Sequence, residues 1–357
     1  MKWMFLNPGW LALLICCLIV ALVYFAHDCD PLAFVIMGSR FAQADPSGAM
    51  GYDGQFAYYI AKDPVGALAH LDNPSYRYQR ILYPFLARLL AIGEPALIPW
   101  TLLLINIVSI TLSTELLGRM LGRYGLHPYI ALLLPLWLGQ IFALRADLNE
   151  PLCIFLVVVA LWWYEKDQVL LSAIAMTASV LAKEIGLLFL PAVVLVELLR
   201  RRWRVVLFYT LPVVLVVAIL QVWLYLWVGR PGFNRLSDRF EIIPFYGFIC
   251  AQPLAARVFL ILIFAVPVAA LLVLAVFHLV RTWRSVYAWS LLTNCLMIAF
   301  LARLSTNDML AVFRVATGLV VAALLFCAAH RLRRLALVLC AIWLPPSILA
   351  VMIPGFL

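Results

Sequence analysis

The stretch GWLALLICCLIVALVYFA at residues 9–26 decides the fold, because it is a long apolar run without a charged side chain. A helix of this length crosses roughly 30 Å of hydrocarbon. Similar runs recur along the 357-residue chain, of which 66% is hydrophobic and only 12% charged. A soluble domain has too little interior for so much apolar surface, and no period-two alternation indicates a barrel. The sequence therefore predicts an all-α polytopic membrane protein.

The apolar runs predict about eleven transmembrane helices, within a range of about ten to twelve. We expect one transmembrane domain over residues 1–357. In it, a long first loop at 27–94 carries short amphipathic helices, and a helical bundle fills 95–357. A further half-buried or re-entrant helix is expected at 81–92. The predicted spans lie near residues 9–26, 95–117, 128–144, 150–164, 169–182, 186–199, 204–228, 254–280, 286–302, 311–329 and 335–353.

Basic residues gather in alternate loops, and such loops face the cytoplasm in membrane proteins. Together with Lys2 they predict a cytoplasmic N-terminus, with the first run as a retained signal anchor. The formal net charge of +9 is explained by this orientation rather than by nucleic-acid binding. The basic residues are Arg119, Arg123, Arg200, Arg201, Arg202, Arg204, Arg281, Arg284, His330, Arg331, Arg333 and Arg334. Nearly all the acidic residues fall in the other loops, which are then non-cytoplasmic: 27–94, 145–150, 183–185, 229–253 and 303–310.

A polar stretch, GYDGQFAYYIAKDP at 51–64, stands in the first of these outer loops. Asp53, Phe56 and Ile60 share one helical face, which predicts a short amphipathic helix along the membrane interface with Tyr58 at headgroup depth. Asp53 lies at the start of this helix, where the dipole favours a carboxylate. The pattern fits an N-cap and a catalytic residue equally well.

Two arginines follow in YRYQRILYP at 76–84. Arg77 and Arg80 are three residues apart, so they face the same way if this segment is helical. They can anchor the loop at the lipid headgroups by snorkelling, or they can hold a phosphate or a sugar. Long loops between packed helices are often functional, which favours the second interpretation.

Two further charged clusters interrupt the apolar sequence. In RADLNEP at 145–151, the carboxylates of Asp147 and Glu150 can face one site if the segment begins a helix; the alternative is an ion pair with Arg145. In VLAKEIGLLFLP, Lys183 and Glu184 mark either a solvated hairpin tip or a place where Lys183 reaches a phosphate. Arg314 is a second candidate for a phosphate-binding cation.

These motifs resemble those of a known enzyme family. DGQFAYYIAKDP at 53–64 resembles the first-loop motif of GT-C glycosyltransferases, in particular the mannosyltransferase-like branch that includes the GPI second-mannose enzymes. LRADLNEPLCIFLVVVAL at 144–161, followed by LAKEIGLLFLP at 181–191, resembles the later pattern of that branch. The resemblance covers roughly residues 45–195, and the rest of the chain matches only as a hydrophobic bundle.

The resemblance implies a transferase that takes a sugar from a polyprenyl-phosphate donor on the non-cytoplasmic side. Asp53 matches the acidic residue of the first loop, Glu150 the glutamate that opens a span, and Lys183 the basic residue before a glycine. The chain departs from the family where Gly54 follows Asp53, since many members carry a second acid there. Asp28 and its neighbour Asp30 form an acidic pair upstream, so the acting aspartate stays open.

The residue types suit an inverting transfer in which a carboxylate removes the proton of the acceptor hydroxyl, and Asp53 is our choice for that base. A lipid phosphate leaves, so cations in a dry cleft would stabilise it. Asp53 and Glu150 are the expected catalytic residues. A divalent cation, Mg or Mn, could be held by Asp53, Asp147 or Glu150, but the sequence does not require one. The expected substrate-binding residues are Asp147, Lys183, Glu184, Arg77, Arg80, Tyr58, Gln55 and Arg314.

The expected partners are the polyprenyl-phosphate sugar donor, a glycan or lipid-linked acceptor, and membrane lipid, without nucleic acid. The predicted location is a bacterial inner membrane. An alternative is a lipid-linked sugar flippase or small-solute transporter, which would carry charges or broken helices near the bilayer midplane. A membrane O-acyltransferase is a third hypothesis, and such an enzyme would require a histidine deep in the membrane. The acidic residues gather on one side, which favours the one-sided enzyme.

Overall fold

The structure, a computed structural model, describes residues 7–233 and 240–353. Lys2, which the predicted orientation uses, lies outside these residues. These described residues form helices and no strand, and they contain an isolated antiparallel bridge between Phe240 and Leu301. The prediction of an all-α protein is confirmed.

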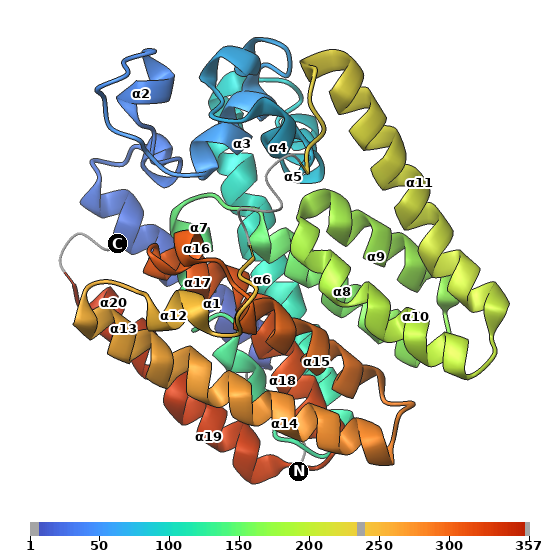
Figure 1. Ribbon diagram of the computed structural model, residues 1–357. Helices are drawn as coiled ribbons and strands as arrows, with labels where there is room; N and C mark the ends of the chain where they lie inside the picture. Colours follow the sequence, from blue (N-terminus) through green and yellow to red (C-terminus); the bar gives the residue numbers. More distant parts are fainter. Residues whose placement is uncertain (1–6, 234–239, 354–357) are drawn as a thin grey trace.

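The helices fall into three groups (Figure 1). The longer ones are α1 (Pro8–Ala26), α6 (Ile98–Arg123), α8 (Glu150–Glu165), α9 (Val169–Ala182), α10 (Leu190–Leu199), α11 (Trp203–Val228), α14 (Val266–Arg281), α15 (Val286–Ala299), α18 (Thr317–Ala329) and α19 (Arg333–Trp343). The shorter ones are α2 (Ser39–Ala42), α3 (Gly54–Lys62), α4 (Pro74–Tyr78), α5 (Leu82–Leu90), α7 (Leu138–Arg145), α12 (Tyr246–Ile249), α13 (Leu254–Leu260), α16 (Arg303–Thr306), α17 (Met309–Val315) and α20 (Pro345–Val351). Tighter turns are η1 (Pro31–Phe34), η2 (Gly66–His70), η3 (Pro95–Leu97), η4 (Pro128–Leu133) and η5 (Glu184–Leu188), and a π-turn, η7 (Ile261–Ala265), joins α13 to α14.

Five helical segments are long and apolar enough to cross a membrane, and a sixth is added if α17 and α18, which meet at 43°, form one span. This supports a helical membrane protein, whereas the number of about eleven spans is not established by these helices. The five segments are Pro8–Ala26, Pro95–Arg123, Trp203–Val228, Leu254–Arg281 and Arg333–Val351.

Two predicted spans differ from the observed helices for local reasons. The run 128–144 is divided into η4 and α7 by a turn at 134–137, where Pro135 offers no N–H to a helix. The run 186–199 begins as the short η5 turn, and only α10 continues it, with a proline in its first turn. By contrast, the prediction 169–182 coincides with α9.

Helix α6 lies near the middle of the bundle and packs against α1 and α8, while α15 packs against α14 and α18 (Figure 1). From Thr317 to Ala328 every residue of α18 is buried, so protein surrounds this helix along nearly its full length. Helix α11 is the opposite case: only 17% of its most apolar stretch is buried, as expected for a surface that lipid covers.

The first loop folds into a cap of short helices, α2 to α5, at one end of the bundle (Figure 1). The expected amphipathic helix is present as α3, but it is enclosed rather than laid along the interface: Tyr58 and Tyr59 are only 7% and 9% exposed. Arg88 holds the end of α3, because its Nη1 donates to the carbonyls of Ala61 (2.9 Å) and Lys62 (2.7 Å). The expected helix at 81–92 is α5, which packs on α3 and α6.

Candidate functional site

A cavity of about 750 Å³ lies where the outer loops of the predicted topology converge. Its lining residues come from 27–94, 183–185, 229–253 and 303–310 or from positions next to these loops. Its lining includes eight charged side chains: Asp53, Asp72, Arg77, Arg80, Lys183, Glu184, Asp308 and Arg314. Apolar side chains also line it: Phe41, Met50, Phe56, Ile185, Leu187, Leu188, Phe233, Phe240, Met297, Leu301, Leu304, Ala311 and Val315.

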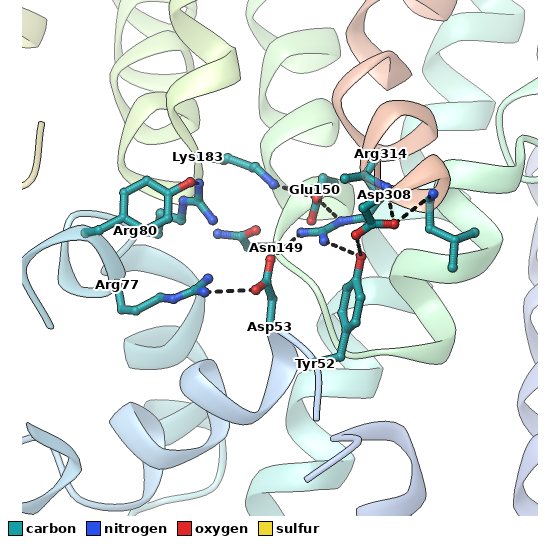
Figure 2. A network of polar contacts seen from close by, with 12 residues as sticks. Tyr52, Asp53, Arg77, Arg80, Asn149, Glu150, Lys183, Asp308 and Arg314 are labelled. Carbon is teal, nitrogen blue, oxygen red and sulfur yellow. Dashed lines mark hydrogen bonds and ion pairs between the residues drawn. The ribbon is translucent and has the colours of Figure 1, made fainter. Parts of the chain in front are cut away.

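Asp53 occupies the N-cap position of α3, yet its side chain makes no capping hydrogen bond. Instead, Oδ1 lies 2.9 Å from Nη2 of Arg77 and Oδ2 lies 2.9 Å from Nη2 of Arg314 (Figure 2). Burial alone would raise the pKa of Asp53, but Arg77 and Arg314 outweigh it and hold this pKa well below its usual range. Asp53 is therefore an ionised carboxylate shared by two arginines, and it remains 32% exposed towards the cavity.

Gly54 lies where the start of α3 closely approaches another backbone segment. A Cβ at this position would lie 2.0 Å from the carbonyl oxygen of Ala146, so the start of α3 approaches the 146–147 backbone more closely than any side chain allows. The GT-C resemblance would favour an acidic residue at position 54, and this contact leaves no room for one.

Arg314 lies in α17 and is caged by three partners while only 5% exposed. Its Nε donates to Oε1 of Glu150 (2.7 Å), its Nη1 to the hydroxyl of Tyr52 (2.9 Å), and its Nη2 to Asp53. The same Oε1 of Glu150 accepts from Nζ of Lys183 at 2.5 Å. Glu150 is fully buried, and its carboxylate joins two cations, Lys183 and Arg314.

Asp308 and Trp137 position α17. Oδ1 of Asp308 caps the helix by accepting from the backbone N–H groups of Leu310 and Ala311, and Oδ2 accepts from the hydroxyl of Tyr52 at 3.0 Å. From the other side, Nε1 of Trp137 donates to the carbonyl of Phe313 at 2.8 Å. The guanidinium of the next residue, Arg314, thereby points towards the cavity.

The predicted pair Arg77 and Arg80 projects from α4 and the turn after it. Nε of Arg77 donates to Asp72 at 2.7 Å, and Nε of Arg80 donates to Oε2 of Glu184 at 2.8 Å. Arg80 is only 7% exposed, so it does not snorkel to the surface, and a second of its nitrogens also donates to Glu184. Burial would raise the pKa of Glu184, but Arg80 lowers it to about 2.

Lys183 keeps an ionisable ammonium in this cluster. Burial lowers its pKa to about 8, and the neighbouring Glu150 partly offsets that effect. The amine is therefore mostly protonated at pH 7 and loses its charge in mildly alkaline solution. Its backbone lies between α9 and η5 and is extended (φ −164°, ψ 144°), which turns the side chain towards Glu150.

Neither Asp147 nor Glu150 lines the large cavity, and the carboxylate of Asp147 is also separate from the cation cluster. It is fully buried, both of its carboxylate oxygens lack a hydrogen-bond partner in the described part of the chain, and its φ is +47°. Burial raises its pKa well above the usual value, with Arg145 opposing. It lines a small cavity of about 30 Å³ that Asp53, Tyr83 and Asn149 share. The alternative pairing with Arg145 does not satisfy these oxygens, since Nη1 of Arg145 donates to the carbonyl of Ala33 (2.7 Å).

The other acidic or polar candidates either have structural partners or lie outside the cavity. Gln55 reaches the cavity wall, but it accepts from the N–H of Gly38 (3.1 Å) and donates to the carbonyl of Met50 (2.8 Å). Asp30 caps η1 through the N–H of Leu32, and Asp28 is exposed; neither lines the cavity. Tyr58 does not line it either.

Sequence reasoning missed Tyr52, Asp72, Asn149 and Asp308. Asp308 carried a signal, because an aspartate before an apolar run is an N-cap pattern in a predicted outer loop. Tyr52 stands next to Asp53, but its contact with Arg314 spans 262 positions and no local pattern contains it. Asn149 donates to the carbonyl of Ala182 at 2.9 Å and so ties two of the site loops together.

The charges around the cavity are nearly balanced. Four cations, Arg77, Arg80, Lys183 and Arg314, pair with the carboxylates Asp53, Glu150 and Glu184. Asp72, which also pairs with Arg77, and Asp308 add two further carboxylates to the lining of the cavity.

A divalent cation does not fit this arrangement. Among residues 7–233 and 240–353, no group of three or more His, Cys, Asp and Glu side chains gathers as cation ligands. Asp53 and Glu150 each face positively charged side chains, which would repel a metal ion. The proposed reaction does not use a divalent cation.

The resemblance to GT-C enzymes rests on short motifs. Comparisons with protein-family models, with curated proteins and with solved structures find no match to this chain.

Proposed function

We propose that this protein is a membrane glycosyltransferase of the GT-C type, a hexosyltransferase similar to mannosyltransferases. It would move a sugar from a polyprenyl-phosphate donor to a lipid-linked or cell-surface glycan acceptor. The observation that carries the proposal is a cavity in which a partly exposed carboxylate, Asp53, pairs with the largely buried Arg77 and Arg314, and which is also lined by many apolar side chains. A sugar phosphate attached to a hydrocarbon chain likewise combines a charged group with an apolar one.

The cations suit a phosphodiester headgroup. Such a group carries one negative charge, and Arg77, Arg80, Lys183 and Arg314 all line the cavity. Arginine and lysine bind phosphate oxygens with charge-assisted hydrogen bonds, which are stronger in a buried site than in water. Leu301, Leu304 and Phe233, which also line the cavity, would contact the first part of the lipid chain.

In the proposed reaction, the acceptor oxygen attacks the anomeric carbon with inversion while Asp53 takes its proton. The bond between the anomeric carbon and the phosphate oxygen breaks, and the lipid phosphate leaves with the electron pair. Arg77, Arg314 and Lys183 stabilise that charge. Glu150 contributes by holding Arg314 and Lys183 in place, since it accepts from both.

The predicted topology supports a reaction on one side of the membrane. The cavity draws on the acid-rich outer loops, and no residue of the Arg-rich loops at 119–123, 200–204, 281–284 or 330–334 lines it. A transporter or flippase needs a site that both sides can reach in turn. The full proposal places this face outside a bacterial inner membrane, with a cytoplasmic N-terminus and about eleven crossings. That count requires shorter apolar helices such as α9 and α15 to cross as well.

Transfer of radiolabelled sugar from polyprenyl-phosphate donors in membranes tests the proposal. Asp53→Asn keeps the size of the side chain but cannot accept a proton, so transfer should fall by about 10²- to 10⁴-fold. Asp28→Asn is the matched control: it lies in the same loop, is exposed, and has φ +54°, a conformation that asparagine adopts well.

Full transfer by Asp53→Asn would remove Asp53 as the base. Absence of transfer from a broad panel of donors, with the protein correctly inserted, would refute the glycosyltransferase and favour the transporter.

A further inference from the structure

Helix α5 turns its charge inwards and its apolar side chains outwards. Its one charged residue, Arg88, is directed towards α3, where Nη1 donates to the last two carbonyls of that helix. The outward face is apolar: Phe85, Leu89 and, just after the helix, Ile92 are exposed, the last two to 72% and 91%. A helix at a surface covered by water has the opposite arrangement, with its charges outside.

These three side chains form one stripe. Their spacing of four and then three residues places them on the same face of a helix. Single exposed apolar side chains are ordinary, whereas a continuous apolar patch indicates a partner. The stripe continues along the chain into η3 and α6, where the exposed apolar residues are Leu97, Trp100, Leu104 and Val108.

The continuation on α6 identifies the partner as lipid. Helix α6 packs against α5 and belongs to the segment Pro95–Arg123, which is long and apolar enough to cross a membrane. Exposed apolar side chains on such a segment face acyl chains. The stripe on α5 extends the same surface beyond the start of the span.

Tryptophans mark the depth at which this happens. Trp100 in the first turn of α6 and Trp223 near the end of α11 are both exposed, and tryptophan is enriched at the level of the lipid headgroups. Tyr78 of α4 packs on Trp223 and Trp227, with ring centroids 6.3 and 4.8 Å apart, so this end of α11 is the one that carries the cap (Figure 1). Since α5 ends at Leu90, shortly before α6 begins, the stripe lies close to this level.

We infer that the stripe of Phe85, Leu89 and Ile92 lies among lipid acyl chains, just below the headgroups on the side of the membrane that carries the cap. This contact fixes the depth of α5 and, through Arg88, the depth of α3, whose N-cap is Asp53. The inference does not depend on the proposed function, because it concerns how deep the cavity sits and not which reaction occurs there.

Bimane fluorescence measures the depth of the stripe. Leu89→Cys is labelled with bimane in the purified full-length protein, which is then reconstituted in phosphatidylcholine vesicles. Val108→Cys is the control inside the membrane, since it lies about 15 Å along α6 from Ile98 at 1.5 Å per residue. Ser47→Cys, in the exposed loop after α2, is the control in water. Each variant is made in a background without exposed or partly exposed thiols: Cys17→Ala, Cys29→Ser, Cys250→Ser and Cys340→Ala.

Phospholipids with bromine near the headgroup end of the acyl chain should quench the Leu89→Cys label at least about half as strongly as mid-chain bromine quenches the Val108→Cys label. Bromine quenching no greater than that of the Ser47→Cys label overturns the inference. Iodide in the water then separates the two reasons: strong quenching by iodide places α5 in water, and weak quenching shows that protein, such as a second copy of this chain, covers the stripe.

The wild type supplies a second measurement that needs no substitution. It is reconstituted with a phospholipid that carries a photoreactive diazirine on its acyl chain, and the labelled peptides are identified by mass spectrometry. Residues 85–92 should be labelled as heavily as residues 100–108 of α6, and the loop around Ser47 many-fold less. Labelling of 100–108 without labelling of 85–92 overturns the lipid contact, whether or not the protein transfers sugar.

Discussion

Asp147→Asn should stabilise the protein and leave its sugar transfer intact. In the unfolded chain this aspartate ionises near pH 3.9, whereas burial raises its pKa in the folded protein well above that value. Folding above pH 4 therefore requires the carboxyl group to bind a proton. The free energy of unfolding falls by about 1.4 kcal/mol per pH unit from this one group until its folded pKa is reached.

Asparagine removes that penalty and keeps the shape. It is neutral at every pH, nearly the same size, and tolerant of the left-handed backbone at φ +47°. The advantage of Asp147→Asn should be absent near pH 4 and grow with pH by up to about 1.4 kcal/mol per unit. Thermal unfolding of the detergent-purified protein, followed by tryptophan fluorescence from pH 4.5 to 8, measures it.

Asp167→Asn is the matched control. Asp167 also has a positive φ, +57°, but its side chain is 74% exposed and pairs with Arg202 at the surface. This change should shift stability little and in a pH-independent way near neutrality. The reasoning is refuted if Asp147→Asn is less stable than the wild type at pH 7, or if it folds but loses transfer, because Asp147 would then act as an ionised group.

Three further predictions concern the cation cluster. Glu150→Gln removes the anion shared by two buried cations, so the free energy of unfolding should fall by about 3 kcal/mol or more, and an unchanged unfolding midpoint would contradict the role of Glu150. Transfer should weaken as the pH rises through about 8, where Lys183 loses its charge, mainly as a higher KM for the donor; Lys183→Arg should abolish that decline. Gly54→Ala places a methyl group 2.0 Å from a carbonyl oxygen, so the free energy of unfolding should fall by about 1–3 kcal/mol and Asp53 should be displaced. Transfer at the wild-type rate would contradict this, because it would show that the loop moves without disturbing Asp53.

The sequence predicted helices well where a single run of residues determines them. The bounds 169–182 agree with α9, and the first apolar run agrees with α1 apart from its first residue. The run 128–144 was wrong as one continuous helix, because Pro135 and a turn divide it, and composition alone does not show where a helix breaks. The short α3 was predicted from its periodicity, but the burial of its tyrosines depends on packing against the rest of the cap.

The candidate site was predictable in its charged residues and not in their pairing. Asp53, Arg77, Arg80, Glu150, Lys183 and Arg314 were singled out because charges are rare in an apolar chain. No local pattern indicated that Asp53 would meet Arg314 across 261 positions, or that Asp147 would turn away from Glu150 only three residues on. Both outcomes depend on the close approach at Gly54, which is a property of two packed backbones.

The enclosed helix α18 has a consequence for biogenesis. Its neighbours α6, α8 and α15 are synthesised earlier, and they can close around a core only when α18, close to the end of the chain, fills the space between them. The helix just before it, α17, carries Arg314. A nascent chain therefore holds Asp53 without one of its two cation partners, and the proposed transferase would remain incomplete until its synthesis is almost finished.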